Sequence, residues 1–194
     1  MMNHILITLA SVLVASTAFA QTWTIDKTHS YVGFKVNHLV VSKVKGQFSE
    51  FSGAISNFDG KDFSKASVEV SIDPRTIDTQ NEKRDQHLRS SDFFAADSIP
   101  EMKFKSTKII PGSGNKFQVI GDLTMRGVTK PVTLDAEFNG AIAGMRGQTA
   151  GFSAVGKINR QDWGVSWSRA LDNGGLVVSD EVELNLEVEV NQQQ

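Results

Sequence analysis

Apolar and polar residues alternate with a period of two along most of this chain. The run from Glu181 to Val190 shows the pattern most clearly, with aliphatic residues at even positions and Glu or Asn at most odd ones. Such a strand, with one dry and one wet face, is typical of an antiparallel sheet. The same alternation marks residues 31–36, 51–55, 66–72, 102–104, 117–125, 128–138 and 150–158. We therefore expect an all-β fold of about eight main strands.

Short turn signals separate these runs. Pro111 to Asn115 is a Pro-Gly-Ser-Gly-Asn cluster, and Arg126-Gly127 has the length of a hairpin turn. Asn139-Gly140 and Asn173-Gly174-Gly175 supply residues that tolerate positive φ. Strands joined by short links predict an antiparallel sandwich or barrel.

One segment, near Thr79–Ser90, breaks the β pattern and predicts a short helix. Thr79 and Glu82 have the spacing of a capping box, with Thr79 as the N-cap. Asp85 and Arg89 are four residues apart and are expected to pair on one helical face. Because the helix lies between two strands, it could close one end of a barrel as a lid.

The first twenty residues have the character of a cleaved signal peptide. An apolar core from Ile5 to Val14 precedes a small-x-small site at Ala18-Phe19-Ala20, although no Lys or Arg lies before the core. The apolar stretch is short and no stop-transfer charges follow it, so we expect export without stable membrane insertion. Residues 21–194 are then one domain in a periplasmic or secreted protein.

Composition and the absence of common motifs argue against several classes of partner and active site. The formal net charge is −2 with interspersed signs, which argues against nucleic acid as a partner, and the chain has no cysteine. His29, His38 and His87 have no compact metal-ligand spacing, so we expect no metal site. The sequence lacks a G-x-S-x-G elbow, a G-x-G-x-x-G loop and a P-loop. We therefore expect no cofactor, no catalytic residue and no enzyme.

The aromatic content raises the question of a cavity. The chain has 12 Phe, and small residues stand beside large ones on the inner faces, as Gly33 does beside Phe34 and Gly53 beside Phe51. An eight-stranded barrel either fills with side chains or holds one small ligand. A packed core with glycines at barrel bends and a ligand cavity are equally compatible with these residues.

Several motifs carry a resemblance to a known family. They are the run Arg84 to Phe94, Gly121 to Val132, Trp23 to Ser30, Phe34 to Leu39 with Gly46-Gln47-Phe48, Pro100 to Ser106, and Arg160-Gln161-Asp162-Trp163-Gly164. In this order they resemble the YceI-like family from Trp23 to about Val190. The resemblance implies a lipocalin-like barrel that holds a long polyisoprenoid or fatty-chain lipid with its polar head near the open end.

Candidate ligand-binding residues follow from the inner faces and the expected lid. They are Phe34, Val36, His38, Phe51, Ile55, Arg84, His87, Phe93, Phe94, Phe104, Phe117, Phe152 and Trp163. Arg84 and His87 would either meet the polar head or form ion pairs that fix the helix to the rim. We expect Arg126 and Lys130 to be solvated, and Trp163 and Trp167 to share one face of a strand.

Two other functions remain open at this point. One is a filled-core module that binds a membrane protein partner, and the other is an enzyme acting on an isoprenoid lipid. The resemblance also leaves open a homodimer. Neither the ligand's chain length nor its head group follows from the sequence.

Overall fold

The computed structural model describes residues 21–39, 41–144, 147–169 and 176–193. The strands are β1 (Thr22–Ile25), β2 (Tyr31–His38), β3 (Ser42–Phe48), β4 (Phe51–Ser56), β5 (Ser67–Ile72), β6 (Ile77–Asp78), β7 (Met102–Pro111), β8 (Lys116–Met125), β9 (Val128–Gly144), β10 (Gly147–Asn159) and β11 (Val178–Gln192). The helix α1 spans Glu82–Arg89, and the short 3-10 helices are η1 (Lys27–His29), η2 (Pro74–Thr76) and η3 (Arg160–Trp163).

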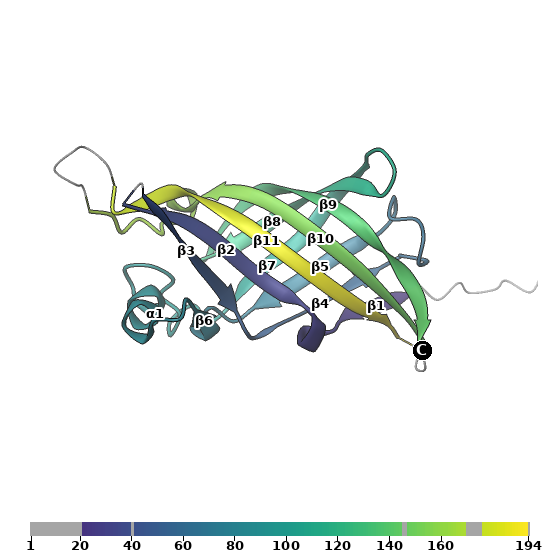
Figure 1. Ribbon diagram of the computed structural model, residues 1–194, viewed down its shortest axis with the longest axis horizontal. Coiled ribbons are helices and arrows are strands. Elements are labelled where there is room, and N and C mark those ends of the chain that lie inside the picture. The colour runs from purple at the N-terminus through teal and green to yellow at the C-terminus, as the bar shows by residue number, and fades with distance from the viewer. Residues whose placement is uncertain (1–20, 40, 145–146, 170–175, 194) are drawn as a thin grey trace, which may run out of the picture.

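These strands form one closed antiparallel barrel (Figure 1). The barrel has eight positions around its wall, and we call the strand or pair of consecutive strands at each position a stave. Three staves are kinked and contain two strands each: β1 with β2, β3 with β4, and β5 with β6. β11 closes the ring because it pairs with β2 along most of its length and with β1 near its end. Every stave pairs with its neighbours in sequence, so the expected eight-stranded barrel is confirmed.

The two ends of the barrel differ. One end carries α1, β6, the β2–β3 and β8–β9 turns and η3, and the other carries β1, the β4–β5 loop, the β7–β8 turn and the C-terminus (Figure 1). We call the first the lid end and the second the closed end. The lid is residues 79–99, which comprise α1 and the turns that follow it.

All eight predicted runs lie in strands, but the staves are longer than the alternation indicated. The eight predicted runs did not include β1, β3 or the two-residue β6, because kinks interrupt their staves and Gly46 replaces an apolar residue on the inner face of β3. A Cβ atom at position 46 would overlap the ring of Phe34, and one at Gly121 would overlap that of Phe104. Both glycines therefore make room for a neighbouring ring on the barrel wall.

The predicted turns have mixed outcomes. Arg126 (φ 51°) and Gly127 (φ 74°) form the tight β8–β9 turn, as expected. The prediction of a turn at Asn139-Gly140 was wrong: β9 continues through it, and the pairing with β10 shifts register there, as a β-bulge does. Asn173-Gly174-Gly175 lies outside the described residues.

The helix is present, but its predicted start was wrong. The N-cap is Asn81, whose Oδ1 accepts a hydrogen bond from the Arg84 amide at 3.0 Å, and not Thr79. Asp85 is buried and accepts from the Thr79 amide and hydroxyl at 3.0 and 2.5 Å, so it does not pair with Arg89. Arg89 contacts Glu82 instead, at 2.9 Å.

Candidate ligand-binding cavity

The barrel contains an apolar cavity of about 250 Å³. For comparison, a buried apolar cavity of about 150 Å³ holds benzene. Almost every residue on the wall is aliphatic or aromatic, and the wall draws on all eight staves as well as on the lid. The lining residues that recur in the argument below are Phe34, Val36, Ile55, Phe63, Leu88, Phe93, Phe94, Phe104, Phe117, Phe152, Ala154 and Arg160. The cavity therefore suits an apolar guest.

Aromatic rings seal the closed end. The β4–β5 loop folds inward there, because Asp59 accepts the amides of Lys61 and Asp62 at 2.9 and 2.8 Å and so turns the chain. These same bonds lower the pKa of Asp59. The Phe58 ring stacks on Phe63 with centroids 4.2 Å apart. We call the cluster formed with their neighbours the aromatic plug; it contains Trp23, Phe58, Phe63, Phe117, Phe138 and Phe152.

The plug has one polar anchor. The indole Nε1 of Trp23 donates to the carbonyl of Phe58 at 2.9 Å, and both side chains are fully buried. Phe63 stacks in turn on Phe117, with centroids 4.7 Å apart, and its ring forms part of the cavity floor. The plug therefore blocks passage through this end of the barrel.

The lid covers the other end with three apolar side chains. Leu88 comes from α1, and Phe93 and Phe94 come from the turns after it. Polar contacts hold the lid in place: Arg126 donates through Nη1 to the carbonyls of Ser91, at 2.8 Å, and Phe93. The prediction that Arg126 is solvated was therefore wrong, whereas Lys130 is exposed as expected.

Arg84 anchors the start of the lid. Its Nε donates to Thr79 Oγ1 and its Nη2 to the Thr79 carbonyl, both at 2.7 Å. These are structural contacts, and Arg84 does not line the cavity. Of the two roles considered for Arg84, the structure favours fixing the helix, because these donors are already engaged.

His87 lies on the outer rim of the lid and also off the cavity wall. Its Nε2 is 2.8 Å from Asp92 Oδ2, and its ring meets Phe93 and Trp167 edge to face at about 5 Å. These contacts join α1 to the segment that follows η3. His87 therefore fastens the lid to the barrel rim.

Among the described residues that line the cavity, Arg160 alone is ionisable, and the sequence interpretation did not include it in the site. It is only 4% exposed. Its Nε donates to the Ser179 carbonyl at 2.9 Å, and its Nη1 donates to Val165 at 2.5 Å and Trp167 at 2.8 Å. Nη2 contacts Asp180 Oδ1 at 3.0 Å. Burial lowers the pKa of the guanidinium, and the Asp180 carboxylate opposes that shift.

The arrangement leaves Arg160 no strong free donor for a ligand. A guanidinium has five N–H donors, and its partners here are carbonyls and one carboxylate on the segments around η3 and β11. Arg160 therefore ties these segments together under the rim. Its motif was visible in the sequence, but nothing in the spacing indicated that its partners lie up to twenty residues away.

The predicted site residues divide into two groups. Those on the cavity wall are Phe34, Val36, Ile55, Phe93, Phe94, Phe104, Phe117 and Phe152. Those that the structure places off the wall are His38, Phe51, Arg84, His87 and Trp163. Phe51 begins β4 directly after a kink and is buried in the core outside the cavity, and His38 is half-buried at the end of β2.

Trp163 and Trp167 do not share a strand face, because η3 interrupts the chain there. The indole Nε1 of Trp163 donates to the Leu123 carbonyl at 3.0 Å, which fixes it in the core. Trp167 lies against the lid instead, with its ring centroid 5.4 Å from that of Phe93.

One polar cluster on the outer surface was not expected. Asp26, His29 and Glu189 offer three ligand atoms within 4.8 Å of one another. His29 Nδ1 is 3.1 Å from Asp26 Oδ2, and this contact raises the pKa of His29 and lowers that of Asp26. The groups satisfy one another as an ion pair that joins η1 to β11, which accounts for the cluster.

Comparisons with known proteins identify the family. The model of the YceI-like domain matches residues 23–190. This chain belongs to the YceI-like family. It is 40% identical to a UPF0312 protein of Staphylococcus epidermidis over 166 residues, which cover 84% of this chain and 94% of that protein.

Solved structures agree with this assignment. The YceI protein of Campylobacter jejuni is 37% identical, with a TM-score of 0.69 over 87% of this chain and 96% of that one. A polyisoprenoid binding domain from Saccharophagus degradans is 14% identical and shares the fold, with a TM-score of 0.63 over 88% of this chain and 98% of that one. The expected YceI-like barrel is thus confirmed.

Proposed function

We propose that this YceI-like protein binds a long-chain lipid, of isoprenoid or acyl type, with its tail in the barrel cavity. The observation that carries the proposal is a cavity closed at one end by aromatic rings and lined almost wholly by apolar side chains. Each buried methylene contributes about 0.8 kcal/mol, so a long tail gains affinity without polar contacts. The name of the Saccharophagus degradans domain supports an isoprenoid as the first ligand to test.

The head group would stay at the lid end. Arg160, on the wall, directs its guanidinium to protein partners, so the interior offers no counter-ion for a charged head. A polar or phosphorylated head is therefore expected at the rim near His87 and Asp92, where water is accessible.

A carrier fits these features better than an enzyme does. Catalysis on a bound lipid needs an acid–base pair beside the reacting atoms. Among the described residues that line the cavity, Arg160 alone is ionisable, and it is held by carbonyls and Asp180. We accordingly propose transport, storage or sequestration, and no catalytic step.

We also propose that the protein is exported. Support comes from the apolar run Ile5–Val14 and the Ala18-Phe19-Ala20 site, which predict cleavage before Gln21. Among the described residues, no helix has the length and apolarity needed to cross a membrane. Intact mass measurement of the protein from a periplasmic fraction should give a chain starting at Gln21, and a mass that retains residues 1–20 would refute cleavage.

Native mass spectrometry of the mature protein, followed by solvent extraction, tests lipid binding directly. The proposal predicts one bound isoprenoid or acyl lipid per chain, released on extraction and rebound from added lipid. A lipid-free mass that does not change after incubation with isoprenoid and acyl lipids would refute it and would favour the filled-core module.

Filling the cavity provides a matched pair of variants. Ala154 lies on the cavity wall, whereas the next residue, Val155, is 51% exposed on the outer face of the same strand. Ala154→Phe should reduce the fraction of lipid-bound chains by about tenfold or more, because the new ring occupies the ligand's volume. Val155→Phe should leave that fraction unchanged. Equal retention by the two folded variants would place the lipid outside the barrel.

A further inference from the structure

Exposed apolar side chains gather at one corner of the lid end. Leu39 and Val41, in the β2–β3 connection, are 38% and 85% exposed, and Leu176 is 36% exposed. The Leu39 amide donates to the Val177 carbonyl at 3.0 Å, which holds the two segments side by side. We call Leu39, Val41 and Leu176 the apolar tip. In the described part of the structure these side chains leave apolar surface exposed to water, and such a group marks a site of interaction.

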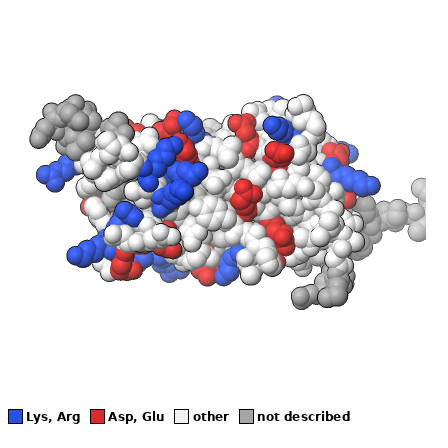
Figure 2. Space-filling view, in the orientation of Figure 1, with Lys and Arg blue, Asp and Glu red and all other residues white. Residues whose placement is uncertain are grey.

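Lysines surround the base of this tip on the outer face of the barrel. Lys35 on β2 and Lys45 on β3 are directly opposite each other in register, and Lys43 lies between Lys45 and the tip. Lys157 on β10 continues the row across the staves. We call Lys35, Lys43, Lys45 and Lys157 the basic patch, and Figure 2 shows blue side chains gathered over β2 and β3 on this face.

The basic patch carries a positive surplus on a protein whose net charge is −2. Lys43 binds Glu183 at 2.6 Å and Lys157 binds Glu181 at 2.8 Å, which leaves two of the four lysines uncompensated by these contacts. The pKa of Glu183 is lowered, chiefly by its hydrogen bond to Lys43 and further by the charges of Lys157 and Lys35. Like charges opposite each other on neighbouring strands destabilise a sheet, so an external anion would relieve the pair Lys35 and Lys45.

The spacing of these groups suits a lipid surface. A strand rises about 3.3 Å per residue, so Lys43 stands about 7 Å and Lys45 and Lys35 about 13 Å from the tip residues of their strands. If the tip is buried about 5–10 Å into the boundary of a bilayer, the lysines behind it lie at the level of the lipid head groups, which their flexible side chains can reach. The tip would thus lie in the apolar interior of the bilayer and the basic patch at its anionic surface.

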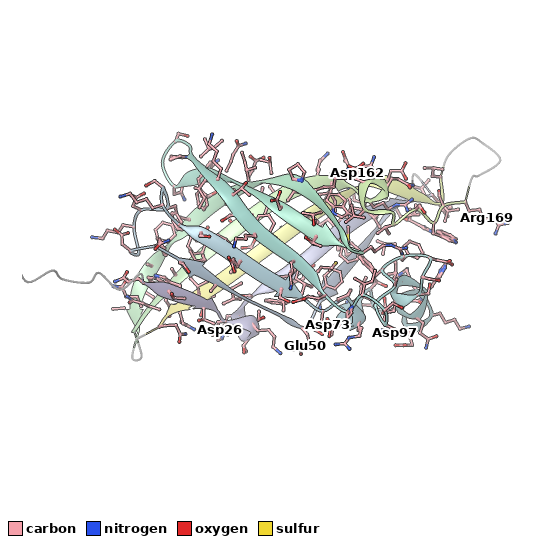
Figure 3. All side chains as sticks on the ribbon, turned by 180° about the vertical axis from the view of Figure 1, so that it is seen from behind. Asp26, Glu50, Asp73, Asp97, Asp162 and Arg169 are labelled. Atoms are coloured by element: carbon pink, nitrogen blue, oxygen red, sulfur yellow. The ribbon has the colours of Figure 1, made fainter. Side chains whose placement is uncertain are left out.

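The other side of the lid end lacks this combination. On α1, Glu82 contacts Arg89 and Lys83 is exposed, and after the helix Asp92 contacts His87, so charges of both signs are mixed there. Figure 3 shows that Asp97 lies on this side, whereas Arg169 points outward beside the segment that follows η3. The charge distribution therefore selects the β2–β3 corner as the face that approaches an anionic surface.

We propose that the apolar tip and the basic patch dock this protein reversibly on an anionic phospholipid bilayer, with the lid end facing the membrane. Phe34 and Val36, which line the cavity, lie on the same strand as Lys35. Docking would therefore bring the lid end of the cavity to the place where a lipid ligand resides. This use of docking rests on the proposed function, but binding to the bilayer does not.

Vesicle flotation of the mature protein tests the proposal. Binding is expected to vesicles that contain phosphatidylglycerol, with release at high salt because of screening, and not to vesicles of phosphatidylcholine alone. The double variant Lys35→Gln, Lys45→Gln should lower the partition coefficient by about tenfold or more, and so should Val41→Asp. Matched controls at the closed end are the double variant Lys108→Gln, Lys116→Gln and Ile142→Asp, since Ile142 is 71% exposed.

The outcomes separate docking from lipid storage. The controls should bind vesicles as the unaltered protein does, and all variants should retain the same lipid by native mass spectrometry, because none of the changed residues lines the cavity. Absence of binding to anionic vesicles, or an equal loss in the patch and control variants, would overturn docking and direct the search to a protein partner. If no preparation, altered or unaltered, contained lipid in the cavity, the proposed function would be refuted and docking would still stand.

Discussion

At one end of the barrel six closely packed aromatic rings close the cavity, and at the other a short polar helix and the turns after it cover it. The plug rings are 4.2–5.8 Å from their neighbours in most pairs and have one hydrogen bond to the backbone, from Trp23. The lid contributes only Leu88, Phe93 and Phe94 to the cavity. The lid is also held by hydrogen bonds from Arg84 and Arg126, by the contact between His87 and Asp92, and by packing of Phe93 and His87 against Trp167.

This difference indicates where a ligand passes. Opening the plug would expose several large rings to water, and each fully buried ring contributes about 1.5–3 kcal/mol. Opening the lid exposes fewer large side chains, namely Leu88, Phe93 and Phe94. It also breaks a few hydrogen bonds at the surface, each worth about 0.5–1.5 kcal/mol net, or more where a charge takes part. Local opening follows the less stable region. We therefore expect the ligand to enter and leave at the lid end, while the plug keeps the barrel folded.

The largest expected effect comes from breaking the plug. Phe58→Ala should lower the free energy of unfolding by about 3–5 kcal/mol, because Phe58 is fully buried among four rings and Trp23 would lose packing with it. Urea unfolding measures the loss. Phe94→Ala in the lid should cost clearly less and should instead speed ligand release. Equal losses of stability in the two variants would contradict the contrast between the ends.

A second, smaller effect should come from Arg160. Arg160→Lys keeps the charge but loses the planar fan of donors, so several carbonyls around η3 and β11 lose their partners. We expect a loss of about 3 kcal/mol in the free energy of unfolding. Arg75→Lys is the matched control, since its bidentate contact with Asp73 is half-exposed and screened by water, so its loss should change stability far less. A loss at Arg160 no greater than at Arg75 would show that the buried network is not stabilising.

The lid anchor should give a local effect. Arg126→Ala removes the donor to the Ser91 and Phe93 carbonyls, and the cost should be about 1–3 kcal/mol. Amide exchange should accelerate in residues 91–96 and remain unchanged in the plug. Lys130→Ala, on the same hairpin and exposed, should change neither. Unchanged exchange at 91–96 in Arg126→Ala would show that the lid is held by other contacts.

The smallest effect concerns pH and the ion pair outside the barrel. The pKa of His29 is raised above 6.5, so its contribution to stability is present at lower pH and is lost as the pH rises through the folded value. The pKa of Asp26 is lowered below 3.8, so its contribution is lost as the pH falls through that lowered value. The difference in Tm between the protein and its His29→Gln variant should thus be small and greatest between these limits. A difference that grows above pH 8 would contradict this assignment.

The barrel was predictable because every stave follows one simple rule: apolar side chains face the interior and polar side chains face water. Val182, Leu184 and Leu186 on β11 follow it without interruption, and so the strand could be read from the sequence. The rule fails where a kink or a glycine intervenes, as at Gly46 in β3. It also says nothing of the β4–β5 loop, so Phe58 and Phe63 were not recognised as the floor of the cavity.

The rim was less predictable because its contacts join distant segments. Glu189 approaches His29 across almost the whole chain, although Asp26 is only three residues away, and a test of local ligand spacing does not detect such a distant partner. The sequence left open whether His87 meets the ligand's head group or an ion pair, and its partner Trp167 could be found only once the lid was placed against the segment after η3. Local helix rules likewise suggested Thr79 as the cap, whereas the buried carboxylate of Asp85 engages Thr79.

Hydrogen–deuterium exchange with and without a bound fluorescent acyl lipid tests most directly the claim that the lid end is the entrance. Ligand binding should slow exchange in residues 88–96 and 165–169, which cover the cavity, and should leave the plug loop 57–66 as slow as before. Arg126→Ala should enlarge the difference at residues 91–96 only. Protection that appears in residues 57–66 while the lid is unaffected would contradict the account, because the ligand would then pass through the closed end.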